Sequence, residues 1–216
     1  MNFGRRTLSR GLGSRGASKC HDLPEVLSLR ERLPERVSRE TTLATATEEL
    51  DARRVLPAFV AVMVWGWGPG GLGALRARWI LTQTTDTSAD VTSLPIDPVV
   101  AVKLEAAARS VRNDGARDAF YLMNNEGALR NLGPSYFTKW LYFCSAVDGA
   151  DSSDAAPIFD KQIVGWLKSA AEVSLDRTKT PSYERYLAIL EEWGRPYGRT
   201  RAQVESEIFR LATGRG

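Results

Sequence analysis

The chain has 216 residues, 43% of them hydrophobic, which is enough apolar material for one core of ordinary globular size. Its two cysteines are too few for a disulfide framework or a four-cysteine cluster, and its one histidine offers no metal pair. The longest apolar run, residues 55–65, is far shorter than the roughly 20 residues that span a bilayer. The sequence therefore predicts a cytoplasmic protein without metal, cofactor or membrane contact. We also expect a monomer, although nothing in the sequence determines the oligomeric state.

The charge is unevenly distributed along the chain. Residues 1–19 contain four arginines and one lysine but no acid, so their charge is +5. The net charge of the whole chain is +3, which leaves 3 − 5 = −2 for the remaining residues. We expect residues 1–21 to form a basic, disordered arm and residues 22–216 to form a single helical domain. The arm either adds sequence-independent affinity for phosphates or is an inert, solvated terminus. Because the body is not basic, DNA binding by it would have to depend on local backbone geometry.

Apolar residues recur at helical spacing through most of the chain. Helices are expected over residues 24–32, 45–54, 57–65, 98–111 and 117–123, near Asp160, from Thr180 and from Thr200. The segment WGWGPGGLG, residues 65–73, holds five glycines and a proline and is expected to be a turn, and residues 82–93 are expected to be a surface loop. No stretch alternates with period two for long enough to predict a strand. The predicted fold class is therefore all-α.

Residues 129–146, LRNLGPSYFTKWLYFCSA, predict two helices joined by a short connection. The first helix is expected to end near Leu129 and the second to start near Pro134, because Asn131 and Gly133 tolerate positive φ and proline suits a first helical turn. Such a helix–hairpin–helix exposes backbone N–H groups that accept a phosphate. The residues expected to contact a DNA backbone are Asn131, Gly133, Ser135 and Thr138. A tight connection between two core helices, with no ligand, is the alternative.

The segment LGPSYFTKWLYF, a Gly/Pro-containing loop and the following PIFD resemble the signature of helix–hairpin–helix base-excision DNA glycosylases. Together with WGWG at residues 65–68 and PIFDKQIVGWL, they are similar to bacterial proteins with the 8-oxoguanine DNA glycosylase fold, over about residues 45–213. The resemblance implies a lysine that attacks the sugar and an aspartate that caps the next helix and assists. Lys139 and Asp160 occupy the matching positions. Asn131 replaces the first hairpin glycine, and the segment from Gly133 to Lys139 is longer than usual.

These residue types suit the cleavage of an N-glycosidic bond. The reaction builds positive charge on the sugar, which a carboxylate fixed at a helix N-terminus, Asp160, would stabilise. Desolvation that lowers the pKa of Lys139 would make its amine a nucleophile, and Phe137 and Trp140 are expected to supply the apolar wall. Attack would then give a Schiff base and permit strand cleavage. Without the lysine, water activated by Asp160 would give a glycosylase that has no lyase activity.

An enzyme that acts on a nucleobase in DNA must extrude that base and stack it in a pocket. The residues expected to form the pocket are Trp65, Trp67 and Phe137. The implied substrate is double-stranded DNA that contains a modified base, such as an oxidised purine. Hypermodified bases of invading phage DNA are an alternative, since a fold does not transfer specificity.

Simpler interpretations of the same residues also stand. Lys139 alone would be an amphipathic side chain whose head reaches water, Asp160 an N-cap, and the aromatic residues part of the core. The chain would then be a non-catalytic DNA-binding module, or a helical interaction protein that binds no nucleic acid.

Overall fold

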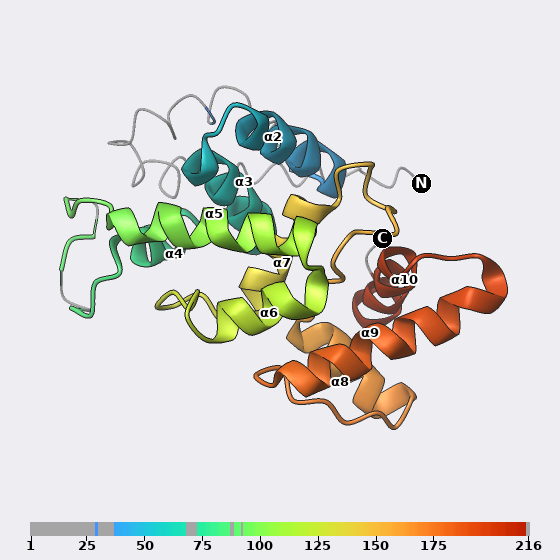
Figure 1. Ribbon diagram of the computed structural model, residues 1–216. Coiled ribbons are helices and arrows are strands. Elements are labelled where there is room, and N and C mark those ends of the chain that lie inside the picture. Colours follow the sequence, from blue (N-terminus) through green and yellow to red (C-terminus); the bar gives the residue numbers. More distant parts are fainter. Residues whose placement is uncertain (1–28, 30–36, 68–72, 87–88, 92, 215–216) are drawn as a thin grey trace, which may run out of the picture.

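The computed structural model describes residues 29, 37–67, 73–86, 89–91 and 93–214. Within these ranges the chain forms helices and connections and no strand, which confirms the all-α class (Figure 1). The predicted arm at residues 1–21 and all but one residue of the predicted helix at 24–32 lie outside the described residues. The helices are α2 (Arg39–Asp51), α3 (Val55–Trp67), α4 (Gly73–Thr82), α5 (Pro98–Asn113), α6 (Ala116–Asn124), α7 (Pro134–Ser145), α8 (Lys161–Ala170), α9 (Thr180–Gly194), a 3-10 turn (Arg195–Tyr197) and α10 (Arg201–Thr213).

The central helix α3 is longer than the sequence predicts. It is the apolar run of the chain, and its side chains are buried from Pro57 through Met63. The glycine at position 66 does not end it: the helix continues through Trp67, so the expectation of a turn that begins at Trp65 was wrong. The rest of the expected turn, residues 68–72, lies outside the described residues.

Helix α2 begins six residues earlier than expected because Ser38 caps it. The Ser38 hydroxyl accepts from the Thr41 N–H at 3.2 Å, and the Thr41 hydroxyl accepts from the Ser38 N–H at 2.9 Å. This reciprocal pair satisfies backbone donors that would otherwise be free at the helix start. As a result Arg39 is helical and, as shown below, faces the candidate site.

The connection between α6 and α7 is also longer than predicted. Helix α6 ends at Asn124 rather than near Leu129, and α7 starts at Pro134 as expected. Gly127 explains the early end, because its N–H donates to the Leu122 carbonyl at 2.8 Å and an added Cβ would lie only 2.9 Å from that oxygen. Asn131 then adopts φ of +64°, the left-handed conformation predicted for it.

Helix α7 lies in the middle of the molecule and packs against α2, α3, α5 and α6, while α8, α9 and α10 form a second group beside it (Figure 1). Two tyrosines of α9 hold the chain between α7 and α8: the Tyr183 hydroxyl donates to the Pro157 carbonyl at 2.9 Å and the Tyr186 hydroxyl to the Ile158 carbonyl at 3.0 Å. These bonds fix the segment that leads into Asp160. None of the helices in the described ranges is long and apolar enough to cross a membrane.

Candidate active site

Lys139 is held in a buried position on α7. Its side chain is almost inaccessible, with 7% of the residue exposed. The ammonium nitrogen Nζ donates to the Ser135 carbonyl at 2.8 Å and to Asp160 Oδ2 at 3.4 Å, and it lies 5.2 Å from the centre of the Tyr136 ring. Burial lowers the pKa of Lys139 and is the largest effect, although the Asp160 carboxylate opposes it. The lysine therefore releases its proton more readily than a solvated lysine.

Asp160 is the N-cap of α8, as predicted. Its Oδ1 accepts from the N–H groups of Gln162 at 2.9 Å and Ile163 at 3.2 Å, which leaves Oδ2 to face Lys139. One carboxylate thus both anchors a helix and contacts the lysine. Because the backbone before it is also tied down, its position is rigid.

Gly66 gives the lysine its space. A Cβ at this position of α3 would lie 2.9 Å from Lys139 Cδ, closer than side chains normally approach, and 3.6 Å from Cε, an ordinary contact. The aliphatic stem of Lys139 therefore passes against bare helix backbone. This is the physical reason for a glycine inside an otherwise apolar helix, where glycine costs about 0.5–1 kcal/mol relative to alanine.

Lys139 and Asp160 open onto a cavity of about 770 Å³. Its aromatic lining comes from Trp65, Trp67, Tyr136 and Phe209, and its charged lining from Arg39, Lys139, Asp160, Lys161 and Glu205. A volume of this size accommodates a drug-sized ligand, and hence a nucleobase with its sugar. The structure brings both predicted tryptophans to the cavity with the predicted lysine and aspartate.

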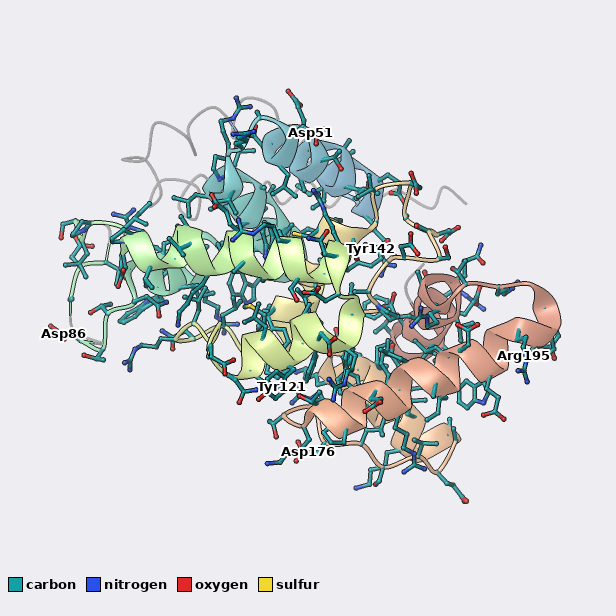
Figure 2. All side chains as sticks on the ribbon, in the orientation of Figure 1. Asp51, Asp86, Tyr121, Tyr142, Asp176 and Arg195 are labelled. Carbon is teal, nitrogen blue, oxygen red and sulfur yellow. The ribbon has the colours of Figure 1, made fainter. Side chains whose placement is uncertain are left out.

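A buried ion pair in this cavity has no counterpart among the sequence predictions. Arg39 Nη1 lies 3.2 Å from Glu205 Oε2, and Glu205 is completely buried. The Arg39 guanidinium also lies 5.6 Å from the ring centre of Trp65 and 4.9 Å from that of Tyr142, which Figure 2 labels near the start of α2. Burial raises the pKa of Glu205, and Arg39 opposes that rise. A buried carboxylate therefore holds the Arg39 guanidinium, a hydrogen-bond donor, in place at the cavity.

One signal in the sequence identifies Glu205, whereas none identifies Arg39. Ala202, Glu205 and Ile208 recur every three residues on the buried face of α10, so a charge stands in the middle of an apolar stripe. Arg39 lies outside the helix expected over residues 45–54, so hydrophobic periodicity assigned it to no helix face.

Two predicted site residues belong to the core instead. Thr138 is fully buried, and its hydroxyl donates to the Pro134 carbonyl at 2.7 Å and accepts from the Phe159 N–H at 3.1 Å. The prediction that it contacts DNA was wrong. Phe137 is 1% exposed and packs edge-to-face on Phe120 at 5.0 Å, so its assignment to the base pocket was also wrong.

The apolar wall beside Lys139 also differs from the prediction. Trp140 packs on Phe59 at 5.7 Å and donates from Nε1 to the Leu104 carbonyl at 3.2 Å, and neither it nor Phe137 lines the cavity. Tyr136 takes that place, since its ring lies beside the Lys139 amine.

The other predicted backbone-binding residues lie at or near the surface where α7 begins. Asn131 and Gly133 are exposed and Ser135 is half-buried, with its hydroxyl accepting a hydrogen bond from Arg177 Nη1. Their contact with DNA stays a prediction. Across the described ranges, no three His, Cys, Asp or Glu side chains are grouped so as to hold a metal ion.

The chain matches one family model over residues 5–209, almost its whole length. The family is described as "Putative 8-oxoguanine DNA glycosylase OGG-like protein". Neither the curated proteins nor the solved structures gave a match.

Proposed function

Because the chain belongs to the 8-oxoguanine DNA glycosylase OGG-like family, we propose that it excises a modified base from duplex DNA with Lys139 as nucleophile and Asp160 as electrostatic partner. The observation that supports these roles is the 3.4 Å contact between Lys139 Nζ and Asp160 Oδ2, buried at a cavity of nucleotide size. A lysine that only packed its stem would keep its head in water. Lys139 as a whole is only 7% exposed, and burial lowers the pKa of its amine, which suits a nucleophile.

The proposed reaction starts from the neutral amine. Its lone pair bonds to C1′ of the deoxyribose while the C1′–N bond breaks and its electrons leave with the base. The proton that Nζ then loses neutralises the departing base. The nitrogen lone pair next expels the ring oxygen O4′, which takes a proton from water, and a protonated Schiff base joins Lys139 to C1′. Water then removes a proton from C2′, a double bond forms between C2′ and C3′, and the phosphate leaves C3′ with the electrons of its bond, which is the proposed strand cleavage.

Asp160 stabilises the positive charge that develops on the sugar. Two backbone N–H groups hold its Oδ1, so the carboxylate is already oriented and need not reorganise during the reaction. Its position 3.4 Å from the lysine also puts both groups within reach of one sugar carbon.

The cavity walls suit a purine that has left the base stack. Trp65 and Trp67 offer aromatic surface, and Arg39, which Glu205 holds in place, offers a donor for the hydrogen-bonding edge of the base. We propose an oxidised purine such as 8-oxoguanine as the substrate, in line with the family's description. The exposed start of α7 at Asn131 and Gly133 would hold a phosphate of the same strand, since a helix N-terminus carries partial positive charge.

Base release tests this proposal. Duplexes carrying 8-oxoguanine, an alkylated purine or a hypermodified pyrimidine are incubated with the protein, and the released base is measured by mass spectrometry. We expect release from the oxidised purine and none with Asp160→Asn, which keeps an oxygen for the cap but loses the charge. Release from the hypermodified base alone would reassign the substrate to phage-type DNA. No release from any duplex would refute the enzyme assignment.

A further inference from the structure

A second cavity, of about 460 Å³, adjoins the first. Its lining consists of Trp67, Arg76, Trp79, Thr84, Thr85, Arg130, Asn131 and Tyr136. Arg76, Trp79 and Arg130 have no part in the chemistry proposed above. Among the described residues the lining contains no acid, so it combines aromatic surface with positive charge.

One pair of aromatic side chains, Trp67 and Tyr136, forms the wall between the two cavities. The rings of Trp67 and Tyr136 lie 4.7 Å apart at 40°, and both residues line both cavities. Trp67 Nε1 is buried and has no hydrogen-bond partner among the described residues, so the wall holds an unused donor. A group bound in the second cavity would therefore sit next to a group bound in the first.

The arginines of this cavity are available to a ligand. Within the described ranges, the guanidinium groups of Arg76 and Arg130 have neither an ion pair nor a hydrogen bond, and both residues are exposed. The backbone of Arg130 is nevertheless fixed, because its N–H donates to Gln83 Oε1 at 2.9 Å. Guanidinium groups recognise phosphate, and aromatic rings beside them stack on bases.

We propose that the second cavity binds a nucleotide of the target strand, next to the one that enters the catalytic cavity. Its base stacks on Trp79, and its phosphate contacts Arg76 and Arg130. Consecutive nucleotides of one strand lie next to each other, and these two cavities are also neighbours. The identity of the ligand as DNA rests on the proposed function, whereas the aromatic and basic character of the cavity does not.

Binding to uncleavable DNA tests this inference without catalysis. The duplex carries an abasic-site analogue at the target position and the fluorescent base 2-aminopurine at a neighbouring position of the same strand or on the opposite strand. We expect the wild-type protein to change the fluorescence of the same-strand probe. Trp79→Leu should abolish this change and weaken binding about tenfold, since one base loses its stacking partner.

Substitution of the two arginines provides a second, independent test, because both are exposed and their replacement leaves the core unchanged. Arg76→Gln and Arg130→Gln should each reduce the slope of log affinity against log salt by about one. Arg195→Gln is the matched control, since Figure 2 places that exposed arginine at the end of α9, away from α4. It should bind as the wild type does.

Three results would overturn the inference. The first is unchanged binding by the arginine variants, and the second is a fluorescence change from the opposite-strand probe alone. The third is loss of the same-strand fluorescence change on addition of free deoxynucleoside monophosphate while the DNA stays bound. The last would show a site for free nucleotides. Base release from a lesion duplex, measured on the same wild-type preparation, reports separately on the proposed function. Its absence would refute the enzyme, whereas base release together with variants that bind normally would refute only the second nucleotide site.

Discussion

Replacing Gly66 by alanine should separate catalysis from folding. The added Cβ would stand 2.9 Å from Lys139 Cδ, whereas ordinary contacts of this kind begin at 3.4 Å. To restore an ordinary contact, the lysine stem must retreat by 3.4 − 2.9 = 0.5 Å. It can do so by changing its side-chain torsions, because the atom that is struck belongs to a long, flexible chain rather than to backbone.

The same displacement has different consequences for stability and for rate. Overpacking of a core costs about 1–3 kcal/mol, and part of this is offset because alanine suits a helix interior better than glycine by about 0.5–1 kcal/mol. The nucleophile, in contrast, loses its alignment with Asp160, and a misplacement of about 1 Å lowers a rate by about 100-fold. We expect Gly66→Ala to unfold with a free energy within about 2 kcal/mol of wild type and to release base about 10- to 100-fold more slowly.

Gly165→Ala is the matched control for this experiment. Gly165 lies in α8, the helix that Asp160 caps, and an added Cβ there meets nothing within 4 Å. The control should be at least as stable as wild type and equally active. Urea unfolding gives the stabilities, and single-turnover base release on the lesion duplex gives the rates. A Gly66→Ala protein that releases base at the wild-type rate, or a Gly165→Ala protein that is slowed equally, would refute the role assigned to Gly66.

Three further predictions concern α7. Because the folded protein lowers the pKa of Lys139, the single-turnover rate should rise with pH as the amine loses its proton. The rate should level off below pH 10.5, the pKa of an ordinary lysine. A rate that still rises in proportion to hydroxide at pH 10.5 would contradict this. The same lowered pKa means that the native protein releases the Lys139 proton at a lower pH than the unfolded chain, so the free energy of unfolding of the wild type should gain a contribution as the pH rises toward 10.5, and Lys139→Met should lack it; equal pH dependence of the two urea midpoints would be inconsistent with this. Thr138→Val leaves the Phe159 N–H without its acceptor and should cost about 1–3 kcal/mol in urea unfolding, whereas an unchanged midpoint would show that this bond contributes nothing.

The parts of the site that the sequence predicted well are local or carried by a motif. Asp160 precedes a helix in a position typical of an N-cap, and the structure confirms the cap. The position of Lys139 came from the resemblance, which relates α7 to the segment that follows. The pair lies 21 residues apart in the chain, and the connection is held by side chains of α7 and α9.

The parts that the sequence could not predict depend on distant packing. Arg39 and Glu205 are 166 residues apart, and no local pattern links them. Thr138 and Phe137 were misplaced because α7 is buried from residue 137 through 145, so hydrophobic periodicity did not show which face meets the cavity. The end of α6 was misplaced because the contact of Gly127 with Leu122, rather than helix propensity, ends that helix.

Borohydride trapping tests the central claim about Lys139 most directly. Sodium borohydride added during the reaction with a lesion duplex reduces a Schiff base to a stable bond between protein and DNA. The account predicts a trapped complex whose modified peptide contains Lys139, no complex with Lys139→Gln, and an unchanged yield with Lys168→Gln, an exposed lysine of α8. Base release by the wild type without any trapped complex, or a complex formed through another residue, would contradict it.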